Sequence, residues 1–133
     1  MGAHPYWYVV PYETDVEDAL LKLRQREFQA GRYNPVTTFP EFPVPLDAAT
    51  PGPQHRSIEE VLENMNEDGT RSILDITQVA RLPFDGNQMP FCTAFPLADS
   101  EIVELFGTPQ PKRQAVEANR SMWDRIARGR PFM

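Results

Sequence analysis

Cysteine, histidine and long apolar runs are scarce in this chain of 133 residues. The single cysteine, Cys92, excludes an internal disulfide, and we interpret it as a small apolar side chain of the core. With only two histidines, His4 and His55, no zinc site built from histidine and cysteine can be assembled. No apolar run approaches the roughly 18 residues that a membrane-spanning helix needs, so we expect no membrane contact.

The chain also lacks the short motifs of several large enzyme classes. It has no Gly-x-Ser-x-Gly, no phosphate-binding loop and no dinucleotide-binding fingerprint. Residues 1–5 do not resemble the basic and apolar regions of a secretory signal, and we therefore expect a cytoplasmic protein. We also expect no cofactor, no resident metal and no catalytic residue.

Basic residues are outnumbered, with 13 Lys and Arg against 19 Asp and Glu, for a net charge of −6. An acidic chain is a poor general binder of nucleic acid, so we expect no nucleic-acid partner. The charge is uneven, because residues 112–133 carry +4 and the remaining 111 residues carry −10. The basic segment is most simply interpreted as docking on its own body or on a neighbouring copy.

The chain is organised around residues 6–31, where a run of aromatic and β-branched side chains leads into a helix. Residues 6–12 have the composition of a strand. Thr14 and Glu17 have the spacing of a capping box, and Gly31 provides a stop. We therefore predict a strand over 6–12 and a helix over 15–30.

Proline marks the next part of the chain, with six of the fourteen prolines between residues 35 and 53. Phenylalanine, valine and leucine side chains lie between them, which predicts that residues 33–56 form an ordered proline-rich loop lying against the body. Ser57 and Glu60 form a second capping box, which predicts a helix there.

The remaining elements are predicted from residue composition and from the Gly and Pro residues that separate helices and strands. We predict strands over 70–79 and 91–97, a short helix over 101–106 and a basic C-terminal helix and tail over 112–133. For part of the strand over 70–79, a helix over 73–81 is the alternative. The fold class is then α+β, a small and mainly antiparallel sheet of about three strands packed with three to four helices and the long proline-rich loop. By its size the chain, 1–133, is a single domain.

Residues 64–75 have the spacing of a calcium-binding loop. Asn64, Asn66 and Asp68 alternate, Gly69 follows at the sharp turn, and Asp75 closes the twelve-residue stretch. Asn and Asp replace the usual acidic ligands at the two ends, so the alternative is a helix end and an Asp-Gly turn. Cation binding at Asn64–Asp75 is left open.

Aromatic and arginine side chains gather at the end of the first helix and in the strand before it. Arg32, Tyr33 and Asn34 follow the helix stop, and Tyr8 lies in the predicted strand. Such side chains often anchor binding surfaces, and His55 adds a titratable group from the proline-rich turn. These five residues are our candidate binding site, and a role in the core is the alternative for each aromatic.

Four stretches, residues 6–12, 26–35, 51–55 and 68–76, give the chain a family resemblance. Over residues 6–107 it is similar to an uncharacterised group of small bacterial proteins. The resemblance implies a bacterial cytoplasmic protein, and it names no activity and carries no catalytic residue.

The sequence therefore predicts a small non-enzymatic module that binds a protein partner or forms a homo-oligomer. One alternative is a small enzyme with its site under the proline-rich loop, which would use Arg32, Tyr33, His55 and a carboxylate. Another is an acidic toxin-neutralising protein of the immunity type, because an acidic surface speeds association with a basic partner.

Overall fold

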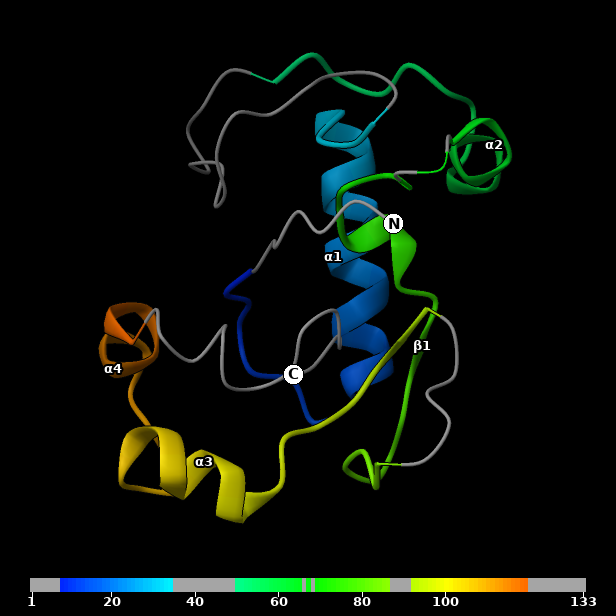
Figure 1. Cartoon of the computed structure of the whole chain (residues 1–133). Helices are drawn as coiled ribbons and strands as arrows, with labels where there is room; N and C mark the ends of the chain where they lie inside the picture. Colours follow the sequence, from blue (N-terminus) through cyan, green and yellow to red (C-terminus); the bar gives the residue numbers. More distant parts are fainter. Residues whose placement is uncertain (1–7, 35–49, 66, 68, 87–91, 120–133) are drawn as a thin grey trace. The chain divides into compact units, whose positions relative to one another are not determined.

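The computed structural model describes residues 8–34, 50–65, 67, 69–86 and 92–119. These residues form four α-helices, one short 3-10 helix and a two-stranded sheet, so the fold mixes α and β (Figure 1). The chain divides into two compact units, residues 1–77 and residues 78–133, and each is described by itself. The single-domain organisation of 1–133 stays a prediction.

The first helix, α1, spans Val16–Ala30 and begins one residue later than the capping pattern predicts. Asp15, rather than Thr14, is the N-cap, and its carboxylate accepts the N–H of Glu17 at 2.9 Å. Gly31 ends the helix in the left-handed conformation, with φ of 73°, as predicted.

Gly31 is also required by a close approach of the chain. A Cβ atom at this position would lie 2.1 Å from the carbonyl oxygen of Gly52, and Gly52 N–H donates to Ala30 O at 3.1 Å. The Pro-Gly-Pro turn at 51–53 is thereby attached to the end of α1. Residues 35–49 lie outside the described residues, so the ordered proline-rich loop stays a prediction.

The second helix, α2, spans Ile58–Asn64 and has the predicted cap. Ser57 Oγ accepts Glu60 N–H at 3.2 Å. The Glu60 carboxylate accepts the N–H of Arg56 at 2.6 Å, one residue earlier than in a standard capping box.

The core of the first unit lies where α1 and α2 meet the 3-10 helix η1, Ile73–Asp75, which contacts both. The buried apolar cluster consists of Phe28, Tyr33, Val61 and Leu74, with Ile58 packed against it. Tyr33 is fully buried, and its ring stacks on Phe28 with centroids 5.9 Å apart.

Both strands predicted in the first unit are wrong over most of their described length. Residues 8–12 form no strand, although their composition suits one. Within 70–79, residues 73–75 form η1, which matches part of the helical alternative, and strand structure is confined to residues 78 and 79.

Local side-chain hydrogen bonds replace a strand ladder at 70–76. Ser72 Oγ accepts Leu74 N–H at 3.1 Å, and Asp75 Oδ1 accepts Thr70 N–H at 2.8 Å. Short polar side chains that satisfy nearby backbone groups compete with strand pairing. The β-branched composition is therefore outweighed here by turn chemistry.

The sheet of the second unit pairs β1, Gln78–Val79, with β2, Thr93–Ala94. The pairing is parallel, with Gln78 opposite Thr93, so the prediction of a mainly antiparallel sheet is wrong for the described strands, and these are two rather than three. The strands are joined by thirteen residues, which is long enough for the crossover that parallel pairing needs.

Two helices complete the described part of the second unit. The third, α3, spans Asp99–Phe106 and ends at Gly107 as predicted, but its N-cap is Ala98, which makes no side-chain cap. The fourth, α4, spans Arg113–Ala118. Most of the predicted basic segment 112–133 lies outside the described residues.

Candidate functional site

The Tyr33 hydroxyl lies against His55 inside the first unit. Tyr33 Oη is 3.0 Å from His55 Nδ1 and also accepts the N–H of Gln54 at 3.2 Å. The hydroxyl can donate one hydrogen bond and accept two, so it can bond to both Gln54 and His55 at once. Two of the five predicted site residues are therefore in direct contact.

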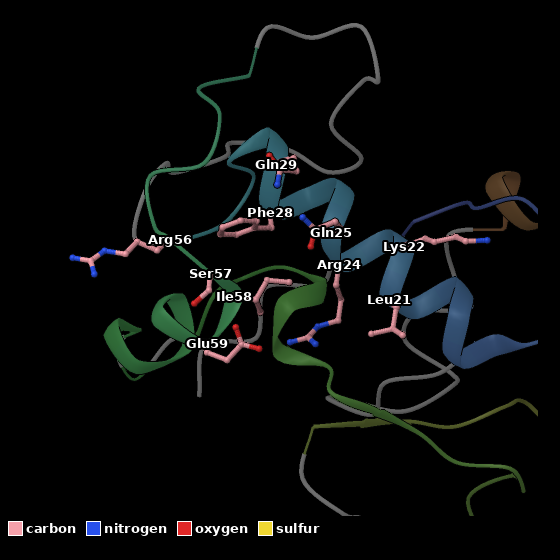
Figure 2. Close-up of a pocket in the computed structure, with 10 residues that line it drawn as sticks. All are labelled: Leu21, Lys22, Arg24, Gln25, Phe28, Gln29, Arg56, Ser57, Ile58 and Glu59. Carbon is pink, nitrogen blue, oxygen red and sulfur yellow. The ribbon is translucent and has the colours of Figure 1, made fainter.

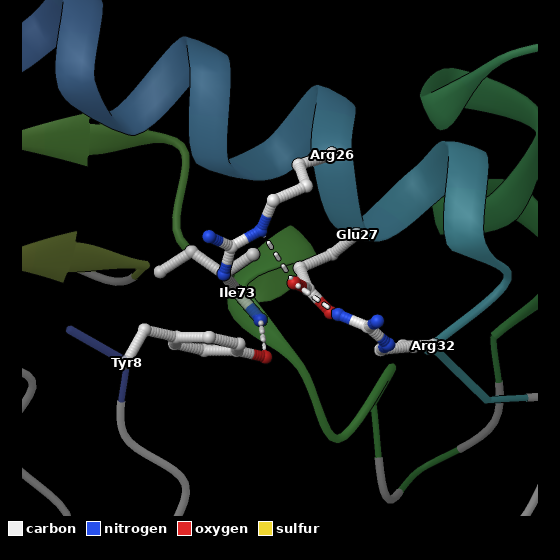
Figure 3. Close-up of polar contacts among 5 residues, drawn as sticks. All are labelled: Tyr8, Arg26, Glu27, Arg32 and Ile73. Atoms are coloured by element: carbon white, nitrogen blue, oxygen red, sulfur yellow. Dashed lines mark hydrogen bonds and ion pairs between the residues drawn. The ribbon is translucent and has the colours of Figure 1, made fainter. Parts of the chain in front are cut away.

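Arg32 is buried and belongs to a different network, shown in Figure 3. Its Nη1 lies 3.2 Å from Glu27 Oε1, and Nε of Arg26 lies 3.0 Å from the same oxygen. Glu27 is 1% exposed, so one buried carboxylate neutralises a buried guanidinium and is shared with a second one. Arg32 is thus held by the interior and does not present its charge to solvent.

Asn34 and Tyr8 hold the turn at 69–73 in place. Asn34 N–H donates to Thr70 O at 2.8 Å, and its amide Nδ2 donates to Gly69 O at 3.3 Å. The Tyr8 hydroxyl accepts Ile73 N–H at 3.2 Å (Figure 3). Both residues have structural partners across long sequence separations.

Burial raises the pKa of Tyr8 well above its usual range, and the hydrogen bond from Ile73 N–H opposes only part of that shift. A phenol with a raised pKa stays protonated at neutral pH. Tyr8 therefore offers a neutral hydroxyl rather than a phenolate base or nucleophile.

In the candidate cation loop, the last carboxylate accepts hydrogen bonds from another residue of the same loop. Asp75 Oδ1 accepts Thr70 Oγ1 at 2.7 Å as well as the Thr70 N–H. Asn66 and Asp68 lie outside the described residues. Within the described ranges, no group of three or more His, Cys, Asp or Glu side chains is placed to hold a metal ion.

A groove of about 590 Å³ lies between α1 and the start of α2 (Figure 2). Its lining consists of Leu21, Lys22, Arg24, Gln25, Phe28, Gln29, Arg56, Ser57, Ile58 and Glu59. Leu21 is 59% exposed, whereas Phe28 on the same helix is a core residue. Arg24 Nη2 donates to Leu74 O at 3.1 Å, so this guanidinium joins α1 to η1.

Sequence reasoning missed both the groove and Glu27. A signal for Glu27 was present, because positions 16, 20, 23 and 27 share one face of α1 and the first three carry apolar residues. A carboxylate at the fourth position of an apolar stripe indicates a buried, paired charge. The groove leaves no such signal in the sequence, because its shape depends on how α1 and α2 pack against each other.

Comparisons with protein-family models, with curated proteins and with solved structures found no match for the chain. Among the described residues, no helix is both long and apolar enough to cross a membrane.

Proposed function

We propose that this chain is a small non-enzymatic protein-binding module and that the groove between α1 and α2 receives a segment of its partner. The observation that carries the proposal is the exposed Leu21 in a groove whose lining includes the core residue Phe28 and Ile58, which packs against the core. A partner segment with apolar side chains, lying along this groove, would remove Leu21 from water.

The groove has the mixed lining of a protein-binding surface. Its apolar residues are accompanied by the amides of Gln25 and Gln29, which are exposed. In Figure 2, Lys22 and Arg56 extend away from the space between the helices, toward its rim. Interfaces commonly combine an apolar centre with a polar rim, and this arrangement supports the proposal.

The state of the titratable residues also supports a binding role over a catalytic one. Arg32 is buried against Glu27, and the Tyr8 phenol is held neutral and accepts a backbone N–H. Each of these groups is thus engaged within the first unit, and none of the three residues lines the groove between α1 and α2. Catalysis requires such groups to converge on a substrate.

The test compares two exposed leucines in the full chain. Leu21→Asp puts a charge in the groove, and Leu82→Asp makes the same change at a 76% exposed leucine of the second unit. The tagged chain is used to capture proteins from an extract of its native host. We expect one specific partner to be retained by wild type and Leu82→Asp and lost by Leu21→Asp; equal retention by both variants would remove the groove from the proposal.

A second candidate function, a small enzyme, has one observation in its favour. Nδ1 of His55 is held by Tyr33, and a histidine oriented through one ring nitrogen can transfer a proton through the other. An activity abolished by His55→Gln and kept by Leu21→Asp would favour the enzyme over the binding module.

The other expectations stay predictions. These are the toxin-neutralising role, the absence of nucleic-acid partners and the cytoplasmic location. The strongly acidic composition remains the argument for the first two.

A further inference from the structure

The groove between α1 and α2 differs in charge from the rest of the acidic chain. Residues 1–111 contain 7 basic and 17 acidic side chains. Three of the basic ones, Lys22, Arg24 and Arg56, line the groove, whereas Glu59 is the one acidic residue among the described residues that line it. The lining therefore carries a formal charge of +2, although residues 1–111 as a whole carry −10.

Two of these basic side chains are placed to meet a carboxylate from another molecule. The Arg56 side chain is exposed, and its guanidinium makes no hydrogen bond or ion pair within the described part of the chain. Lys22 lies 2.7 Å from Glu13, but its side chain is 69% exposed, so solvent weakens this pair and a second carboxylate can approach. In Figure 2, the ring of Phe28 lies between Arg56 and Lys22. Apolar surface is thus flanked by positive charge.

We propose that the segment received by this groove is acidic, a stretch of a partner protein that combines apolar side chains with Asp or Glu. The inference rests on the proposed function and specifies the chemistry of the partner. The apolar side chains cover Leu21 and Phe28. The carboxylates lie beside Arg56 and Lys22. Such a segment is complementary to the groove in both apolar surface and charge.

The acidic body makes the groove selective for such a segment. The Debye length is about 8 Å at physiological ionic strength, so a bound segment interacts mainly with charges close to it. A basic segment meets favourable charge at many places on an acidic chain, whereas an acidic segment is repelled from most of them. Residues 112–133, which carry +4, are the other basic region, and the test separates the two.

The spacing of the apolar residues sets the length of the segment. Leu21 and Phe28 are seven residues apart on α1, which is about 10 Å along the helix axis. A helical partner covers both with residues seven apart, and a polyproline-type partner covers them with residues three apart. A dodecapeptide is long enough in either form.

The test begins with a random dodecapeptide library that is displayed on phage and selected on the full chain. Peptides that Leu21→Asn also retains are discarded, because this variant removes the apolar contact without adding a charge. We expect the remaining peptides to combine leucine or phenylalanine with more Asp and Glu than Lys and Arg. Neutral or basic peptides would overturn the inference and leave the groove as a binding site. If Leu21→Asn retains every selected peptide, the groove is removed from the proposed function as well.

Binding of one selected acidic peptide is then measured by fluorescence anisotropy. Arg56→Glu should weaken binding about tenfold or more, because the charge that pairs with the peptide is reversed. The matched control, Arg81→Glu, reverses an exposed arginine of the second unit and should bind within about twofold of wild type. Glu59→Gln removes the acidic residue of the lining and should bind the peptide more tightly, a gain that misfolding cannot produce.

Urea unfolding confirms that Arg56→Glu is folded, and added salt should weaken the binding of the acidic peptide to wild type, because salt screens exposed charges. The inference is overturned if Arg56→Glu and Arg81→Glu bind the peptide equally, if Glu59→Gln binds it no more tightly than wild type, or if salt leaves its affinity unchanged.

Discussion

The hydroxyl of Tyr33 lies 3.0 Å from Nδ1 of His55, although the two residues are 22 positions apart in the sequence. This contact joins the end of α1 to residues 54 and 55, next to the Pro-Gly-Pro turn at 51–53. The N–H of Gln54 donates to the same oxygen. Since Tyr33 is fully buried and stacks on Phe28, its phenol connects the core to this turn.

Tyr33→Phe should destabilise the first unit by about 1–2 kcal/mol, because it removes a hydroxyl with two partners and keeps the ring in place. Urea unfolding measures the loss. Tyr12→Phe is the matched control, since Tyr12 is 91% exposed and should unfold like wild type. A Tyr33→Phe variant as stable as wild type would mean that the contact with His55 contributes nothing to the fold.

The helices could be predicted from the sequence because their signals are local. Gly31 and Gly107 end α1 and α3 where expected, and Ser57 caps α2. The exact start of α1 was missed by one residue, since Thr14 and Asp15 both carry a capping oxygen and only the backbone path decides between them. Local chemistry thus sets these helix ends to within about two residues, since α3 begins at Asp99 rather than at residue 101.

The strands could not be predicted in the same way, because strand pairing is decided by distant residues. The segment 70–76 has β-branched residues, but its Ser and Asp side chains bond to nearby backbone N–H groups. The parallel pairing of β1 with β2 depends on the path of the connection, which composition does not specify. Propensity for strands reflects packing context more than backbone preference.

The candidate site was predicted in part. Tyr33 and His55 do meet, yet Arg32, which is adjacent to Tyr33 in sequence, is directed to Glu27. Side chains of adjacent residues in an irregular turn can point in different directions. The sequence does not show which hydrogen-bond network each of them joins. Tyr8 and Asn34 have partners in the turn at 69–73, which the sequence did not connect to them.

Gly31→Ala should be more destabilising than Gly52→Ala. Both glycines have positive φ, 73° and 79°, so each substitution carries a backbone cost of about 1 kcal/mol. Only at Gly31 would the new Cβ also meet an atom, the Gly52 carbonyl oxygen, whereas nothing lies within 4 Å of a Cβ at Gly52. Thermal unfolding of the two variants measures the difference, and equal losses would contradict the close approach of the two glycines.

Glu27→Ala should be among the most damaging single changes in the first unit. It leaves the buried Arg32 guanidinium without its carboxylate, and breaking a buried ion pair in this way costs about 3–5 kcal/mol. The double variant Glu27→Leu with Arg32→Met replaces both charges by apolar groups and should recover most of the loss. Urea unfolding of the two variants makes the comparison.

The control for the Glu27 prediction is the ion pair between Glu13 and Lys22. Their charged atoms are 2.7 Å apart, but the Lys22 side chain is 69% exposed. Solvent screens such a pair, so Glu13→Ala should unfold close to wild type. If Glu13→Ala and Glu27→Ala were equally damaging, burial would not be what makes the Glu27 pair important.

Tyr8 should make the stability of the first unit depend on pH in the alkaline range. Its pKa in the folded state lies above the value of about 10 for an unfolded tyrosine, because burial disfavours the phenolate. The folded state therefore binds the phenol proton more tightly than the unfolded state does. Its contribution to stability is complete below about pH 10 and is lost as the pH rises further.

Urea unfolding between about pH 9 and about pH 11 tests this sign. The free energy of unfolding of wild type should fall faster than that of Tyr8→Phe, which has no phenol to ionise in either state. Tyr12→Phe keeps Tyr8 and should fall as steeply as wild type. Parallel curves for wild type and Tyr8→Phe would show that the Tyr8 hydroxyl reaches solvent, which would also remove the hydrogen bond from Ile73 as a fixed contact of the fold.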